Sequence, residues 1–206
     1  MATVKGEARQ LILDAAEELI ARQGVEGVSL RAINAAAGVS PGVLHYHFGS
    51  REVLVTELIS RHMEQLVEQR GRMLDVLQPQ QHPDIRDIVA TLVTPLAELA
   101  RGEAADGRRY VRFIARLYAD RSPILDEVSR RYQEVHQAYP ALLARALPHQ
   151  TAADLELRLA MANHCMLQML ADLTAPVRPW LNQGIERSDA EIIEMLIDFM
   201  CSGIRG

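Results

Sequence analysis

The sequence predicts an all-α protein, with an N-terminal unit of three helices followed by a larger helical region and about nine helices in all. Apolar residues recur at spacings of three and four along most of the chain. No segment shows the alternation of a strand or a βαβ pattern. Aromatic residues make up only 4% of the chain, whereas alanine and leucine, which favour helices, are abundant.

The first three predicted helices lie at about residues 5–23, 30–37 and 41–48, and the second and third are short. A glycine follows each of them, and a serine that can cap the next helix comes soon after it. The glycines are Gly24, Gly38 and Gly49, and the serines are Ser29, Ser40 and Ser50. Proline at the first position of the third helix, Pro41, suits a helix start because its missing N–H has no partner there anyway.

Further helices are expected at about residues 51–76, 84–101, 106–120, 122–147, 151–175 and 188–204. Loops rich in glycine and proline separate them, including the stretch 176–184 before the last helix. The last helix should open with a capping box, since Ser188 is followed three residues later by Glu191.

The composition is that of a globular protein. Of its 206 residues, 49% are hydrophobic and 24% charged. No uninterrupted apolar run reaches the length of about 18 residues that predicts a membrane span, and the first ten residues lack the apolar segment of a secretory signal. Cys165 and Cys201 match no metal-ligand spacing. We therefore expect free, buried thiols in a cytoplasmic protein without membrane, metal or cofactor.

The charge balance gives no support for binding to nucleic acid. The net charge is −5, and residues 1–52 carry five basic and six acidic side chains. A surface that binds nucleic acid is usually basic. Such a function must therefore rest on the geometry of a motif and not on bulk charge.

Residues 29–48 have the layout of a helix-turn-helix. Two short helices are separated by three residues that include Gly38, and the second helix is capped by Ser40. An exposed N-terminal turn of this kind can enter the major groove of DNA, although an ordinary helical hairpin has the same layout. The spacing predicts that Val39, Leu44 and Phe48 pack inward, and that Pro41, Gly42, His45 and Tyr46 face outward.

The N-terminal residues also resemble the DNA-binding domain of the TetR family of transcription regulators. Three stretches match in order and spacing: Leu19 with Gly24, then residues 30–33 with 37–40, and finally residues 44–52. The rest of the chain is similar to the family only in length and helical content. The resemblance implies a regulator that binds DNA through the third helix.

Two residues depart from the family pattern. Asn34 stands where alanine is usual, and its amide needs a hydrogen-bond partner. His45 stands where tyrosine usually donates to a phosphate. Histidine donates best when protonated, so we expect DNA binding to strengthen as the pH falls toward about 6. An operator titration across this range, with His45→Gln as the comparison, tests the expectation.

The resemblance implies contacts to phosphates from Ser29, His45, His47 and Arg51, and contacts to bases from Gly42, Val43 and Tyr46. Arg31 would reach a phosphate or a base. Ser40 is also among the residues expected to contact DNA. The alternative is packing or capping for His47 and a solvated helix face for Arg31. His45 and His47 are not expected to bind a metal, because residues two apart on a helix do not face each other.

The resemblance also implies a homodimer formed through residues 151–175 and 188–204. The first of these helices is apolar on more than one face, as a helix covered on two sides would be. The alternative is the core of a monomer. Two-fold symmetry would place the two recognition helices about 34–36 Å apart, matching a palindromic operator.

The middle helices, at about residues 51–147, are implied to enclose a small-molecule effector, hydrophobic in view of the aliphatic composition. Its binding would act through the long helix after Ser50 and release the DNA. The candidate pocket residues are Tyr110, Phe113, Tyr118, Asn163 and His164. The alternatives are the core for the aromatic residues and the dimer interface for the polar ones. The repeat of Arg108, Arg112 and Arg116 predicts a solvated helix face.

The resemblance thus implies a ligand-responsive repressor, with a DNA-binding domain at 1–52 and a ligand-binding and dimerisation domain at 53–206. An enzyme is not expected, because no catalytic triad order, metal spacing or phosphate loop is present. A second alternative is a protein-interaction module of the same fold without specific operator binding, which the acidic balance permits.

Overall fold

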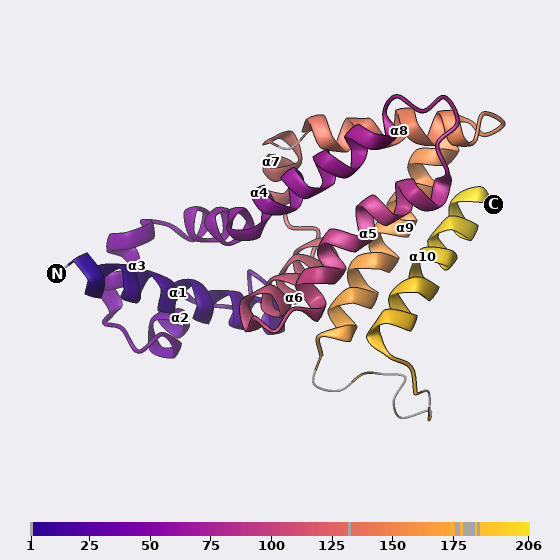
Figure 1. The fold of residues 1–206 in the computed structure, drawn as a ribbon. Coiled ribbons are helices and arrows are strands. Elements are labelled where there is room, and N and C mark those ends of the chain that lie inside the picture. Colours follow the sequence, from indigo (N-terminus) through magenta and orange to yellow (C-terminus); the bar gives the residue numbers. More distant parts are fainter. Residues whose placement is uncertain (1, 132, 176–177, 179–183, 185) are drawn as a thin grey trace.

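The computed structural model describes residues 2–131, 133–175, 178, 184 and 186–206. Every regular element in this part of the chain is a helix, which confirms the predicted fold class (Figure 1). The helices are α1 (Ala2–Gln23), α2 (Leu30–Ala36), α3 (Pro41–Phe48), α4 (Arg51–Leu77), α5 (Ile85–Arg101), α6 (Ala105–Ala119), α7 (Ile124–Arg131), α8 (Gln133–Ala146), α9 (Ala152–Leu173) and α10 (Asp189–Arg205).

Helices α7 and α8 both lie within the helix predicted across residues 122–147, and residue 132, between them, lies outside the described residues. Most of the stretch 176–184, predicted as a connection, also lies outside the described residues.

Side-chain caps explain why the predicted helix starts agree with the structure. Ser29 Oγ accepts a hydrogen bond from the backbone N–H of Ala32 over 3.0 Å. Ser188 and Glu191 form the predicted capping box at the start of α10. A cap of this kind stabilises a helix by about 1 kcal/mol.

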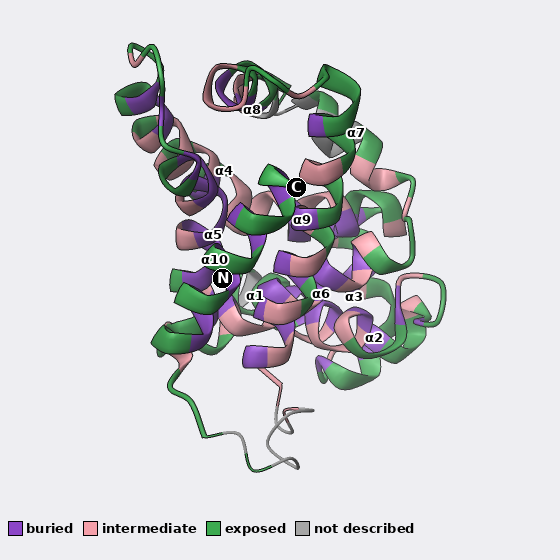
Figure 2. Ribbon diagram, turned by 90° about the vertical axis from the view of Figure 1, so that its right-hand side faces the viewer, coloured by how far each residue is buried: buried purple, intermediate pink, exposed green. Residues whose placement is uncertain are grey.

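Helices α1, α2 and α3 form a unit at one end of the molecule (Figure 1). Their apolar faces meet in a shared core, seen as buried strips on otherwise exposed helices in Figure 2. The inward packing predicted for Leu44 and Phe48 is confirmed, since both are buried, and Val39 packs against the same core. The core residues of this unit are Ile12, Leu13, Ala16, Ile20, Val28, Ile33, Ala37, Leu44 and Phe48.

Helix α1 packs along α6, which joins the three-helix unit to the rest of the chain. Arg109 of α6 and Arg61 of α4 both reach Asp14 of α1, with Nη2 to Oδ1 distances of 3.0 and 2.8 Å. Each guanidinium also lies 3.4 Å from Oε2 of the fully buried Glu17. The junction therefore holds two cations and two carboxylates in a largely buried cluster.

Arg112, on the next turn of α6, also links α6 to α1, and its contacts correct one expectation. Arg112 pairs with Glu18 of α1 at 3.1 Å and donates to the carbonyl of Thr174 at 3.1 Å. Arg112 is thus not on a solvated face, because α6 lies between α1 and α9. The neighbouring Arg116 is more exposed and pairs with Asp120.

Helices α9 and α10 run side by side and pack against α5 and each other (Figure 1). One side of α9 is buried through Leu155, Met166 and Leu170.

Among the helices that the structure describes, none combines the length and the apolar character needed to cross a lipid bilayer.

Candidate nucleic-acid interface and internal cavity

The turn between α2 and α3 is built around a left-handed glycine. Gly38 has φ of +67°, a conformation that side chains disfavour, and the backbone N–H of Val39 donates to the carbonyl of Asn34 over 3.0 Å. The Asn34 side chain is buried at the crossing of the two helices. Its Nδ2 donates to the carbonyls of Leu30 and Pro41 over 3.1 and 3.2 Å, so this departure from the family pattern ties α2 to α3.

One face of α3 is presented to solvent. The outward orientation predicted for Pro41, Gly42, His45 and Tyr46 is confirmed, since all four are exposed. A methyl group added at Gly42 would meet no atom within 4 Å, so the space in front of this residue is open. At Gly42, which has no side chain, another molecule can therefore approach as closely as the helix backbone allows.

The other predicted contact residues on α3 are less open. Val43 is partly buried against the core, and His47 is half-buried with its ring between those of Tyr46 and Phe48. Of the two serines, Ser29 already accepts a hydrogen bond at the start of α2, whereas Ser40 makes no side-chain cap. The hydroxyl of Ser40 is exposed beside Gly42.

Most of the described cations of residues 1–52 are already held within the protein. Arg9 pairs with Glu57 and lies over the Phe48 ring at 5.5 Å, and Arg22 pairs with Glu18 at 2.6 Å. Arg51 donates to the carbonyl of Val25 over 2.9 Å, which holds the start of α4 against the end of α1.

Arg31 differs from these three cations. It is exposed on α2 and has no ion pair within the part of the chain that the structure describes. An exposed arginine without an internal partner is free to bind a phosphate or a base edge. We therefore expect Arg31 to carry more of any DNA contact than Arg51.

Two family models match the chain. Residues 12–58 match the model described as "Bacterial regulatory proteins, tetR family". Residues 90–203, more than half of the chain, match the model described as "Tetracyclin repressor-like, C-terminal domain". The chain belongs to the TetR family. It is therefore a helix-turn-helix transcription regulator and not an enzyme.

Curated relatives agree with this assignment. The chain is 26% identical over 144 residues to the transcriptional regulator UidR of Escherichia coli K12, covering 66% of this chain and 70% of UidR. It is 27% identical over 177 residues to the nicotine-responsive transcriptional repressor HdnoR of Paenarthrobacter nicotinovorans, covering 82% and 87%. Both proteins are named as helix-turn-helix regulators.

A solved structure agrees on the fold. The TetR family regulator PfmR from Thermus thermophilus matches with a TM-score of 0.60 at 19% identity, over 95% of this chain and 97% of PfmR. At this identity the match bears on architecture alone. It extends across both the helix-turn-helix and the larger helical region.

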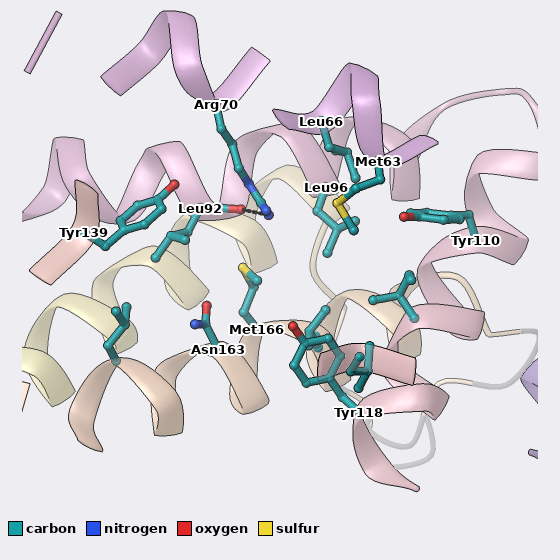
Figure 3. Close-up of a pocket in the computed structure, with 14 residues that line it drawn as sticks. Met63, Leu66, Arg70, Leu92, Leu96, Tyr110, Tyr118, Tyr139, Asn163 and Met166 are labelled. Carbon is teal, nitrogen blue, oxygen red and sulfur yellow. Dashed lines mark hydrogen bonds between the residues drawn. The ribbon is translucent and has the colours of Figure 1, made fainter. Parts of the chain in front are cut away.

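A cavity of about 210 Å³ lies between helices α4 to α9 of this TetR family member (Figure 3). Three of the five predicted pocket residues line it, namely Tyr110, Tyr118 and Asn163. Phe113 is fully buried and is not among the lining residues. His164 is exposed on α9, with its ring edge-on to Tyr118 at 6.3 Å.

Sequence reasoning missed Arg70, which also lines the cavity. The pattern held a sign of it: Arg70 is four residues from Leu66 and four from Leu74, both buried, so it interrupts the apolar stripe of α4. Sequence reasoning also missed the cluster of Asp14, Glu17, Arg61 and Arg109, because ion pairs between distant helices leave no local pattern.

An apolar surface spans α9 and α10. Leu157 and Met161 of α9 and Met195 and Phe199 of α10 are each more than half exposed. A groove of about 530 Å³ is lined by residues of the same two helices and by Arg187, which precedes α10. The groove residues are Cys165, Met169, Arg187, Ile192, Met195, Leu196 and Phe199.

Proposed function

We propose that this TetR family regulator is a ligand-responsive repressor that binds a palindromic operator as a homodimer. The observation that carries the proposal is the exposed face of α3, where Gly42, His45 and Tyr46 are all exposed and a methyl group added at Gly42 would meet no atom within 4 Å. A short helix with a free N-terminal turn suits the major groove, and its positive dipole end suits phosphate.

In this proposal residues 1–52 form the DNA-binding domain. Gly42, Val43 and Tyr46 meet the bases, with Gly42 allowing close approach. Ser29, Ser40, His45 and His47 position the helix on phosphates, and Arg31 supplies the unpaired cation. Arg51 has a smaller part than its sequence position indicated, because its guanidinium already binds the Val25 carbonyl.

Residues 53–206 form the ligand-binding and dimerisation domain of the proposal. The exposed apolar residues of α9 and α10 support a dimer, since four large apolar side chains in one patch favour burial against a second copy. In a two-fold dimer the two α3 helices would lie about 34–36 Å apart, the spacing of successive major grooves.

The ligand response is supported by the position of the cavity. Its walls include α4, which begins directly after α3, and α6, which holds α1 through Arg109 and Arg112. A ligand that shifts either helix changes the relative orientation of the two α3 helices, and so favours the state that does not bind DNA. The relative HdnoR is named nicotine-responsive and a repressor, which agrees with both parts of the proposal.

Selection of genomic fragments that bind the purified protein, followed by gel-shift titration of the enriched site, tests the proposal. We expect an inverted repeat, with half-sites about one helical turn apart. Affinity should fall steeply with rising salt because phosphate contacts release counterions. No enriched sequence, together with binding indifferent to salt, would favour a protein-interaction module instead.

A further inference from the structure

Arg70 is a cation in an apolar cavity. It reaches from α4 toward α5, where its Nη2 donates to the carbonyl of Leu92 over 3.1 Å (Figure 3). Its Nε is buried and has no hydrogen-bond partner. Within the described chain no carboxylate forms an ion pair with Arg70, whereas Arg61, Arg109 and Arg112 each pair with acidic residues of α1.

The surroundings of Arg70 are mainly apolar. Leucine, isoleucine and methionine side chains from five helices form most of the lining, and the other polar atoms come from three tyrosines and one asparagine. In Figure 3 the amide of Asn163 and the hydroxyl of Tyr118 face the same space as Arg70. Burial raises the pKa of Tyr118 and of Tyr139, and the nearby charge of Arg70 acts in the opposite direction on both.

Arg70 is half-buried, with its Nε fully covered, so its guanidinium is partly removed from water without a counterion. Removing a charge from water is repaid only by an opposite charge or by several hydrogen bonds. A single carbonyl leaves most of the donors of Arg70 unused, since a guanidinium carries five N–H groups in a planar fork. That fork matches the two oxygens of a carboxylate.

We propose that the effector is a small apolar monocarboxylate whose carboxylate group pairs with Arg70, while its apolar body lies against the leucines and methionines of the cavity. The inference rests on the proposed function only for the regulatory consequence of binding. One guanidinium matches one negative charge. The volume of about 210 Å³ is below the range of pockets for drug-sized ligands, about 300–1,000 Å³, which favours a compact molecule.

The competing explanation is purely structural, with Arg70 serving only to tie α4 to α5 through Leu92. The two explanations differ in what they predict for ligand charge. A structural arginine gives no preference between an acid and the matching neutral amide. A carboxylate-binding arginine prefers the acid, and the preference disappears with the guanidinium.

Calorimetric titration of the DNA-free protein with two matched pairs, octanoate with octanamide and benzoate with benzamide, tests the proposal. We expect at least one acid to bind about tenfold to a hundredfold more tightly than its amide, the range for hydrogen bonds to a charged group. Arg70→Met should abolish this preference, and Arg70→Lys should retain part of it. Arg72→Met is the matched control, because Arg72 is exposed on the same helix in a pair with Glu68.

Equal binding of acid and amide by the unmodified protein overturns the proposal, as does failure of both acids to bind. A preference that survives in a folded Arg70→Met also overturns it. If Arg70→Met does not fold, the preference of the unmodified protein and of Arg70→Lys decides. Operator binding is measured separately, so its loss with intact carboxylate binding counts against the proposed function and not against this inference.

Discussion

The side-chain amide of Asn34 donates to the carbonyl of Pro41 over 3.2 Å, and so joins the middle of α2 to the first turn of α3. The same amide nitrogen donates to Leu30 one turn back, and Asn34 Oδ1 is buried without a partner. The amide N–H groups of Asn34 therefore hold the crossing of α2 and α3. A carboxylate at this position would face carbonyl oxygens and would have no donor to bind.

Replacing Asn34 with aspartate should destabilise the protein by about 2–4 kcal/mol, because an isosteric carboxylate loses both hydrogen bonds and buries a charge. Asn34→Ala should stay within about 1 kcal/mol of the unmodified protein, since it also removes the unpaired oxygen. Urea unfolding measures both. Equal losses for the two variants would contradict the assigned role of the donor.

Gly42→Ala should weaken operator binding while leaving the fold intact. The added methyl group meets nothing in the free protein but would stand between α3 and the bases. Alanine in place of glycine should itself raise stability by up to about 1 kcal/mol. Gly71→Ala is the control, because Gly71 lies within α4 and its added methyl group is equally unobstructed. Unchanged operator affinity for Gly42→Ala would contradict a close approach of α3 to the bases at this residue.

Arg31→Ala should reduce the dependence of operator affinity on salt. Loss of one phosphate contact lowers the slope of log affinity against log salt by about one for each recognition helix. Arg22→Ala serves as the comparison, since Arg22 is exposed but paired with Glu18. If Arg31 reads a base instead, the slope stays the same and sequence preference relaxes at one position.

Phe199→Glu should convert a dimer into a folded monomer. A glutamate in the apolar surface of α9 and α10 would bury a charge on association, whereas the free chain leaves position 199 about 64% exposed. Val76→Glu is the matched control, being 66% exposed on α4. Sedimentation velocity separates the outcomes. A Phe199→Glu protein that still sediments as a dimer would place the interface elsewhere.

Glu17 should make stability depend on pH. Burial raises its pKa from 4.5 to about 7, although Arg61 and Arg109 act to lower it. The folded state therefore holds the Glu17 proton more tightly than the unfolded state does. Its contribution to stability is full below about pH 4.5 and is lost as the pH rises through about 7, a change of up to about 3 kcal/mol.

Urea unfolding of Glu17→Gln and of the unmodified protein over this pH range isolates the effect from that of other groups. The free energy of unfolding of the unmodified protein should decline relative to that of Glu17→Gln as the pH rises. Parallel profiles would show that the carboxyl group is ionised in both states.

The fold was largely predictable because its determinants are local. Apolar spacing, serine caps and glycine stops are readable within one turn of helix, and they placed α1–α6, α9 and α10 close to their observed bounds.

The candidate site was predictable in part. The periodicity of α3 decided which residues face outward, so the exposure of Gly42, His45 and Tyr46 followed from sequence. The internal partners of Arg51 and Arg112 did not, because Val25 and Glu18 belong to other helices or turns. Arg70 was overlooked although it interrupts the apolar stripe of α4, and its isolation from carboxylates is a property of the assembled cavity that the sequence does not show.

The arginines of α4 and α6 that hold α1 set a limit on how this regulator can be recombined with others. A hybrid that joins residues 1–52 to the effector region of another family member would leave Asp14, Glu17 and Glu18 facing a foreign α6. Unless that helix offered arginines at the positions of Arg109 and Arg112, the hybrid would have carboxylates without a cationic partner where α1 meets α6. Exchangeable parts of such sensors are therefore defined by matched charges across α1 and α6 as much as by the loop at which the chain is cut.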